Sequence, residues 1–350
     1  MQRTSTDLLR LLAMTVVVLI HATAGCEWAI ARGGDWWSWD GLGVVINQGA
    51  RFCVPLFVCL SGYGLAARHL AGRRETWPAF MAGRLGRIAL PYLALSVVVL
   101  ACQDWRGGLL PTLEALARGQ ADYHLYFIPL ILSCYLLFPL LVQRDSRVLW
   151  WTFLIVLLAF ASPAHRLWET IGLRFPGLDG WSPHVWLFWF YHGIRLAHAD
   201  RRGDPAPGRW TLALALVAGV AVIAEFAWWV WPQPGAQPNP GWFDHFQRWV
   251  VVAYGLAFLA AWRAWRVGAN LPATPVGLLS ALSFPVFLAH TAVLRLVLEY
   301  ITTWPLSAGC ITLGLTTAGV WILHVTVPGR WPRRLLGLGD GAPVAVSPRV

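Results

Sequence analysis

The 350-residue chain contains no lysine, and charged residues of all kinds make up only 13% of it. Hydrophobic residues account for 57% and the mean hydropathy is +0.55, values that an ordinary water-soluble domain does not reach. The segments between apolar runs are too short to fold as separate soluble domains. The composition therefore predicts a polytopic membrane protein built as one domain.

The formal net charge of +10 comes from arginine alone. Such a basic chain could bind nucleic acid, but the distribution of the arginines argues against that function. With the N-terminus in the cytoplasm, most arginines fall in cytoplasmic loops or at the inner ends of spans, which is the positive-inside pattern. The charge therefore predicts a membrane orientation with both termini cytoplasmic. The strongest cluster comprises Arg68, Arg73, Arg74, Arg84 and Arg87.

Cysteine is also scarce, with six residues, no CxxC spacing and most positions inside apolar runs. We interpret them as small packing residues. Cys26 and Cys102 both lie near the predicted outer surface, where they could pair, although the sequence does not show that they do. The histidines lack close spacing and carboxylates within the spans are few, so no metal site is predicted.

Ten apolar runs reach or approach the length of a membrane span and predict an all-α fold with about ten transmembrane helices. Residues 1–335 form a single transmembrane domain in this interpretation, and 336–350 a short disordered cytoplasmic tail. A segment with four prolines between Trp231 and Trp242 predicts an exposed turn. The first run could instead be a removable signal peptide, because Ala22-Thr23-Ala24 resembles a cleavage site. The predicted runs are 8–25, 42–66, 87–102, 124–142, 148–162, 183–197, 211–231, 249–265, 274–298 and 306–327.

Two polar residues stand out in the first run. Arg10 and His21 are eleven residues apart, which places them on the same helix face with an axial separation of roughly 16 Å. Asp7 lies one turn before Arg10 and can pair with it. If Arg10 lies at the inner surface, His21 lies near the middle of the hydrocarbon layer, where an ionisable group usually marks a functional site. The alternative is a histidine that only hydrogen-bonds a neighbouring span.

A second polar group interrupts an apolar run between Arg51 and Tyr63 (RFCVPLFVCLSGY). It holds a charge, a proline and a Ser-Gly pair, so we expect an interruption of the helix there. Arg51 either extends to the outer membrane surface or faces a polar cavity beside His21. Ser61 and Tyr63 are candidate supporting residues, although the Ser61 hydroxyl can equally bond back to its own helix.

Three further motifs supply candidate residues. Arg84 and Arg87 lie three residues apart at the start of a predicted span, where two guanidinium groups can bind phosphate through bidentate hydrogen bonds. The same pair can also serve only as a topology signal. His124 and Tyr126 belong to the sequence YHLYF at the outer edge of the fourth run, and His290 ends the sequence FLAH in the ninth.

Together these motifs resemble the membrane acyltransferase-3 family. The resemblance rests on Arg10 with ten residues before His21, VPLF…SGY, RLGRI…PY, YHLYF and FLAH, which occur in the order of the family. It extends from the first apolar run to the ninth and is closest to bacterial enzymes that O-acetylate surface polysaccharides such as enterobacterial common antigen. The chain has YFIP where many members have WFL, and FLAH where they have YL-x-H.

The resemblance implies an enzyme of the bacterial inner membrane that takes an acetyl or other short acyl group from cytoplasmic acetyl-CoA. The acceptor would be a sugar hydroxyl of a surface polysaccharide or a lipid-linked glycan. His21 would be the principal catalytic residue with Arg10, and Arg84 and Arg87 would hold the acyl-CoA, with no tightly bound cofactor. His21 could act as a general base or carry the acyl group itself. Arg10, Arg51, a tyrosine or backbone amides could stabilise the oxyanion.

Two other classes of protein stay open. A transporter or flippase of a lipid-linked sugar would use Glu225 and Arg295, in the seventh and ninth runs, as charges along its pathway. Neighbouring side chains can equally satisfy both charges. An inactive scaffold in a polysaccharide assembly complex would need neither Arg10 nor His21 for its role. The acceptor sugar and the oligomeric state do not follow from the sequence.

Overall fold

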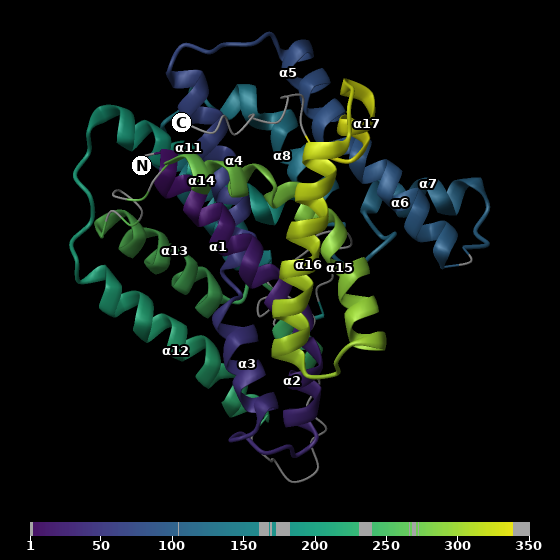
Figure 1. The fold of residues 1–350 in the computed structure, drawn as a ribbon. Helices are drawn as coiled ribbons and strands as arrows, with labels where there is room; N and C mark the ends of the chain where they lie inside the picture. The colour runs from purple at the N-terminus through teal and green to yellow at the C-terminus, as the bar shows by residue number, and fades with distance from the viewer. Residues whose placement is uncertain are drawn as a thin grey trace, which may run out of the picture.

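The computed structural model describes residues 3–338, apart from 104, 161–167, 169, 173–182, 231–239, 266, 268–270 and 272. Every regular element in these residues is helical, as the sequence predicts (Figure 1). Most of the proline-rich turn and the tail from 339 onward lie outside the described residues. The elements are α1 (Arg3–Ala22), α2 (Ala24–Ala31), α3 (Trp39–Gly49), α4 (Cys53–Leu70), α5 (Trp77–Arg84), the π-helix η1 (Leu85–Ala89), α6 (Leu90–Cys102), α7 (Leu109–Arg118), α8 (Phe127–Leu141), α9 (Arg147–Phe160), α11 (Pro183–Arg202), α12 (Thr211–Val230), the 3₁₀ helix η2 (Pro240–Asp244), α13 (Trp249–Ala264), α14 (Ala273–Ala281), α15 (Ser283–Tyr300), α16 (Pro305–Thr326) and α17 (Arg330–Leu335).

Several helices are long and apolar enough to cross a membrane. Among the described residues, five continuous segments qualify, namely α1, α3 with α4, α5 with α6, α12 and α16. The pair α14 and α15, bent by 55°, makes a sixth if it counts as one span. The shorter apolar helices α8, α9 and α13, together with α11, coincide with the other predicted runs. Each predicted run therefore overlaps at least one helix of the described residues, while the number of helices that cross the membrane stays a prediction.

The second predicted run consists of two helices rather than one. Residues 50–52 form a turn between α3 and α4, so the interruption falls at Arg51, at the start of the polar segment. From Cys53 the helix continues unbroken through Ser61. Pro55 is compatible with this helix because it lies in the first turn, where its missing N–H would have no partner.

The third run contains a π-helical turn, η1, between α5 and α6. The backbone N–H of Leu90 donates to the carbonyl of Leu85, five residues earlier. The next residue, Pro91, has no N–H to donate, so a regular α-helical ladder cannot run through this point. π-Helical turns are frequent at functional sites, and this one directly follows Arg84.

Helices α4 and α11 form the centre of the bundle. Helix α11 carries five of the twelve largest fully buried side chains, and it also packs on α8 and α9. Two glycines allow α4 and α11 to touch through their backbones. A Cβ at Gly193 would lie 1.9 Å from the carbonyl oxygen of Cys59, and one at Gly62 would lie 2.1 Å from that of Phe190. Small residues at such a contact are typical of helix packing in membranes.

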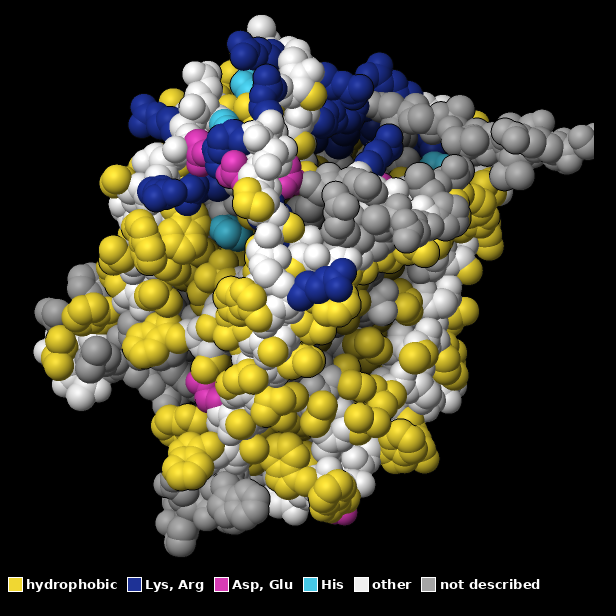
Figure 2. Space-filling view, turned by 90° about the vertical axis from the view of Figure 1, so that its left-hand side faces the viewer, with side chains coloured by type: hydrophobic (Ala, Val, Ile, Leu, Met, Phe, Trp, Pro, Cys, Tyr) yellow, Lys and Arg dark blue, Asp and Glu magenta, His cyan; other side chains and the backbone are white. Residues whose placement is uncertain are grey.

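The two ends of the molecule differ in charge. Figure 1 places the start of α1, α5 and α17 at one end, and α2 with the start of α3 at the other. Arginine side chains gather at the first of these ends, and a largely hydrophobic surface extends below them (Figure 2). Helix α1 runs between these ends and packs against α4, α14, α15 and α16. Asp7 near its start is therefore buried, and Arg10 and His21 are partly buried at successive positions along the bundle.

Candidate functional site

Three histidines from separate parts of the chain meet inside the bundle. His21 lies in the last turn of α1, His290 near the middle of α15, and His124 in the loop between α7 and α8. The ring centroids of His21 and His290 are 5.2 Å apart, and those of His124 and His290 are 5.0 Å apart. Tyr123 also packs on His21, with a centroid distance of 4.8 Å. We call His21, His124 and His290 the histidine cluster.

The histidine cluster contains buried ring nitrogens without a hydrogen-bond partner. His290 Nδ1 lies 2.6 Å from the carbonyl oxygen of Phe287, which can only accept, so this nitrogen carries a proton. Its Nε2 and both ring nitrogens of His124 are buried and have no hydrogen-bond partner among the described residues. Unpaired buried polar groups are costly, so the cluster offers hydrogen-bonding capacity to a ligand or water.

A buried carboxylate anchors the histidine cluster. Asp122 Oδ2 accepts a hydrogen bond from the hydroxyl of Thr291, the residue after His290, and lies 3.8 Å from Nδ1 of His124. Its Oδ1 accepts a hydrogen bond from Arg295 at 2.7 Å. Because Asp122 and His124 share one loop, these contacts tie that loop to α15 and hold the two buried histidines side by side.

A cavity of about 300 Å³ lies at the level of Arg10. Three guanidinium groups, from Arg10, Arg68 and Arg84, contribute to its wall, and we call it the arginine cavity. Arg10 donates to Asp7 at 2.8 Å, as their spacing predicts, and Asp7 also accepts from Ser280. The other lining residues are Phe57, Leu60, Ser61, Gly64, Leu65, Ile88, Phe127, Ile128, Ile131, Tyr135, Ser283, Phe284 and Phe287.

A second, smaller hollow adjoins the arginine cavity. It has a volume of about 150 Å³, and Arg68 and Arg84 line both spaces. Arg73 adds a further guanidinium group to its wall. Two spaces that share two arginines in their walls therefore lie next to each other.

Phe287 separates the arginine cavity from the histidine cluster. Its side chain lines the cavity, and its ring also lies 5.3 Å from that of His124 and 5.8 Å from that of His290. Phe127, a second cavity residue, packs on Phe287 at 5.5 Å. The cavity and the histidines are thus neighbours, with one layer of aromatic rings between them.

The other residues predicted from the sequence fall in different places. Ser61 lines the arginine cavity, and its hydroxyl pairs with Tyr135 of α8 rather than with its own helix. The Tyr63 hydroxyl donates to Asp200 of α11 at 2.8 Å. Arg87 is exposed on η1. Tyr63, Arg87 and Tyr126 are not among the residues that line the arginine cavity in the described part of the chain.

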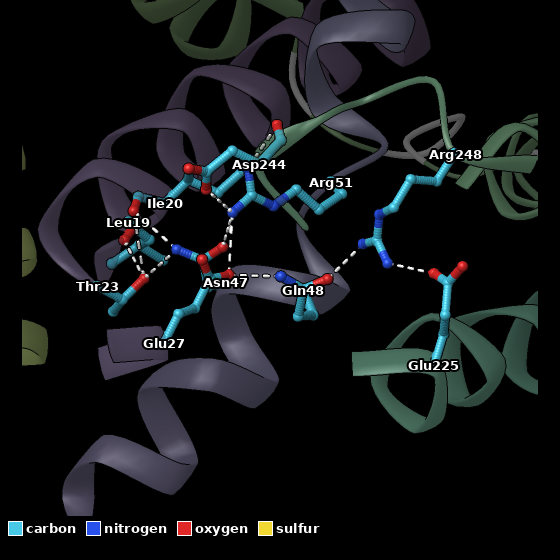
Figure 3. A network of polar contacts seen from close by, with 10 residues as sticks. All are labelled: Leu19, Ile20, Thr23, Glu27, Asn47, Gln48, Arg51, Glu225, Asp244 and Arg248. Atoms are coloured by element: carbon cyan, nitrogen blue, oxygen red, sulfur yellow. Dashed lines mark hydrogen bonds and ion pairs between the residues drawn. The ribbon is translucent and has the colours of Figure 1, made fainter. Parts of the chain in front are cut away.

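Arg51 belongs to a polar network near the opposite end of the bundle (Figure 3). Its guanidinium group donates to Glu27 at 3.0 Å, to Asp244 at 2.9 Å and to Asn47. The network extends through Gln48, which contacts both Glu27 and Arg248. These contacts join α2, α3, η2 and the start of α13, so the surroundings of Arg51 are those of a residue that holds helices together.

The two charges that a transport pathway would use both have partners. Glu225 forms an ion pair with Arg248, which continues the network of Figure 3. Arg295 forms an ion pair with Asp122. Both charges are therefore satisfied by neighbouring side chains, as the alternative interpretation of the sequence anticipated.

Sequence reasoning missed several residues of this site. Arg68 belonged to the basic cluster but had no partner assigned to it, and Asp122 lies directly before the YHLYF motif. Tyr135 and Phe287 carry no distinguishing signal in an apolar run. In the part of the chain that the structure describes, no three His, Cys, Asp or Glu side chains form a group that could hold a metal ion.

Comparisons with known proteins identify one family. Residues 3–325 match a family described as an acyltransferase domain, acyltransferase-3. Comparisons with curated proteins and with solved structures gave no match. Since the family match runs from the start of α1 to the last turn of α16, the chain belongs to the acyltransferase-3 family.

Proposed function

We propose that this acyltransferase is an O-acyltransferase of the bacterial inner membrane. It moves an acetyl or other short acyl group from cytoplasmic acyl-CoA to a sugar hydroxyl of a surface polysaccharide or a lipid-linked glycan. One observation supports this function most strongly: Phe287 lines the arginine cavity and also contacts the rings of His124 and His290. An anionic donor and a proton-accepting group can therefore meet inside one membrane domain.

The arginines suit the donor. Acyl-CoA carries several phosphate groups, and guanidinium groups bind phosphate through paired, charge-assisted hydrogen bonds. Arg68 and Arg84 line both the arginine cavity and the second hollow, where Arg73 joins them. In the proposed arrangement the phosphates bind to these arginines, and the narrow thioester arm extends past Arg10 toward Phe287. Arg87, which is exposed on η1, serves the approach of the donor rather than the cavity itself.

The histidine cluster suits the transfer step. A neutral imidazole nitrogen takes the proton of the acceptor hydroxyl as its oxygen attacks the thioester carbonyl. The carbon–sulfur bond then breaks, and the imidazolium returns the proton to the leaving thiolate. Alternatively, His21 takes the acyl group first and passes it to the hydroxyl. Both routes convert acyl-CoA and an alcohol into an ester and free CoA.

The separation along α1 divides the roles of Arg10 and His21. Eleven helical residues span roughly 16 Å, so the two side chains cannot touch the same reacting atom. Arg10 lines the arginine cavity, and it therefore binds the donor in this proposal rather than the oxyanion beside His21.

The direct test measures transfer of labelled acetyl from acetyl-CoA to glycans in membranes that contain the chain. We expect His21→Ala to abolish transfer and Arg84→Gln to raise the KM for acetyl-CoA about tenfold or more, because hydrogen bonds to charged groups are lost. Arg118→Gln is the matched control, since Arg118 is exposed on α7 and pairs with Glu114. Equal transfer by the native chain and His21→Ala would remove His21 from the mechanism.

The same membranes separate the other classes of protein. Uptake of a lipid-linked sugar into vesicles without any acyl donor would favour a transporter. A scaffold predicts that His21→Ala changes neither transfer nor transport. Mass analysis of surface glycans, with and without the native chain, identifies the acceptor and the acyl group.

A further inference from the structure

Tyr123 links the histidine cluster to the surface of the molecule. His124 and His290 are buried, whereas Tyr123 is 54% exposed while its ring packs edge-on against His21. The cluster also contacts Phe287, which lines the arginine cavity. If the donor occupies the cavity, the exposed ring of Tyr123 offers a second substrate a separate route to His21.

The half-exposed guanidinium group of Arg295 is held next to Tyr123. Asp122 Oδ1 accepts a hydrogen bond from the backbone N–H of Tyr123 at 2.8 Å and another from Nη2 of Arg295 at 2.7 Å. One carboxylate oxygen thus fixes both residues next to each other. The Asp122 side chain is buried, while that of Arg295 is 48% exposed. A guanidinium group has five N–H donors, so a single bond to Asp122 leaves capacity for another anion.

We propose that Tyr123 and Arg295 form the acceptor subsite of the acyltransferase, and that the acceptor is an acidic saccharide. This inference rests on the function proposed above. The ring of Tyr123 packs against the C–H face of a sugar, next to the nitrogens of His21. Arg295 binds a carboxylate or phosphate group of the same or the adjacent sugar, through the bidentate geometry that guanidinium groups favour.

The anchoring by Asp122 distinguishes this pair from ordinary residues of the membrane interface. Trp37, Trp39 and Trp304 are strongly exposed, as aromatic residues at headgroup level usually are. No ring contact joins these three to the histidine cluster in the described part of the chain. Tyr123, in contrast, touches His21 directly, and Arg295 shares its anchor.

The first experiment measures binding of the acceptor without any donor. The purified native chain in phosphatidylcholine vesicles is titrated with a glucuronic acid oligosaccharide and with its neutral glucose counterpart. We expect the native chain to bind the acidic ligand about tenfold more tightly, and Arg295→Gln to lose that preference. Tyr123→Ala weakens binding of both ligands, while Tyr123→Phe, which retains the ring, binds them like the native chain.

Three controls keep the test specific. Tyr300→Ala removes a more exposed tyrosine, from the same helix as Arg295, and should leave binding unchanged. Arg295→Gln leaves the buried Asp122 without its ion pair. The double variant Asp122→Asn/Arg295→Gln removes that unpaired charge, and it should lose the preference for the acidic ligand in the same way. Arg295→Lys retains the charge and should preserve part of the preference.

The outcomes separate this inference from the proposed function. Equal affinity of the native chain for the acidic and neutral ligands overturns the subsite, and so does an unchanged preference in Arg295→Gln. The titrations are repeated in vesicles that contain phosphatidylglycerol. If this anionic lipid abolishes the difference between the native chain and Arg295→Gln for both ligands, Arg295 binds lipid headgroups and the subsite is wrong. Failure of the native chain to transfer acetyl in the separate assay instead contradicts the O-acyltransferase, whatever the binding data show.

Discussion

At the scale of single residues, His290 has a defined chemical state. Its Nδ1 donates to the carbonyl of Phe287, so the lone pair of the neutral ring lies on Nε2. That nitrogen is buried, has no partner among the described residues, and belongs to a ring 5.2 Å from His21. In a folded protein such an atom is costly unless a ligand or water uses it. His290 is therefore the best candidate for a second group that contacts the substrates.

Two substitutions separate the nitrogens of His290. Asparagine places its amide near Nδ1 and can donate to Phe287, while glutamine reaches the position of Nε2. We expect His290→Asn to fold but to lower kcat for acetyl transfer about a hundredfold, the scale of a lost acid–base group. His290→Gln should retain more activity than His290→Asn. Thermal unfolding of both variants is the control, and normal activity in a folded His290→Asn would exclude a catalytic role.

The sequence identified the residue types of the site better than their arrangement. Arg10, His21 and His290 stand out because a polar group in an apolar run is rare. Their meeting depends on how a loop and two helices pack, which a single sequence does not encode locally. Asp122 precedes a recognised motif but became meaningful only with its contacts to Thr291 and Arg295. Phe287 could not be identified from the sequence, because one apolar residue among many in a membrane span does not indicate where it packs.

At the scale of helices, the contact between α4 and α11 determines where α4 lies. Gly62 and Gly193 allow the two backbones to touch, and α4 in turn supplies Leu60, Ser61 and Arg68 to the arginine cavity. Close backbone contact replaces the hydrophobic effect, which does not drive helices together within lipid. A side chain at either position would push α4 away from α11 and displace the part of the cavity wall that α4 supplies.

We therefore expect Gly193→Ala to destabilise the protein by about 1–3 kcal/mol or more, the cost of overpacking a tight contact. Its Cβ would lie 1.9 Å from a carbonyl oxygen of the neighbouring backbone, which cannot rotate away. Gly314→Ala in α16 is the matched control, because no atom outside its own helix lies within 4 Å of the added carbon. Thermal unfolding in detergent measures both, and equal midpoints would contradict this account of the packing.

The sequence predicted helices well and their ends less well. Apolar runs gave all ten predicted segments a helical counterpart, since membrane helices need long apolar stretches. The turn at residues 50–52, the π-helical turn of η1 and the 55° bend between α14 and α15 are breaks inside such stretches. The polar segment that begins at Arg51 indicated the first of these breaks, whereas hydropathy does not detect the other two, because the residues there remain mostly apolar. Helices α2 and α7 were missed since both are too short to span a membrane.

At the scale of the whole molecule, the distribution of charge and the positions of the site residues agree with one orientation in the membrane. The arginine cavity is lined by Arg10, Arg68 and Arg84, and arginine side chains gather at one end of the molecule (Figure 2). Tyr123 packs on His21, which lies in the last turn of α1, eleven residues after Arg10. A donor made in the cytoplasm and an acceptor on the outer side would then meet at His21 without either crossing the whole membrane. This arrangement requires the start of α1 to be cytoplasmic, which the distribution of arginine predicts.

Labelling of single cysteines tests this orientation. The background chain carries Cys102→Ser and Cys310→Ser, which remove the two exposed cysteines. In separate variants of this background, Trp37→Cys places one thiol in the loop before α3, and Arg74→Cys places one in the loop before α5. A membrane-impermeant maleimide added to intact cells should label Trp37→Cys and leave Arg74→Cys unlabelled until the cells are opened. The reverse pattern would place the arginine cavity on the outside, where no acyl-CoA is present, and would contradict the proposed direction of transfer even if His21 proved essential.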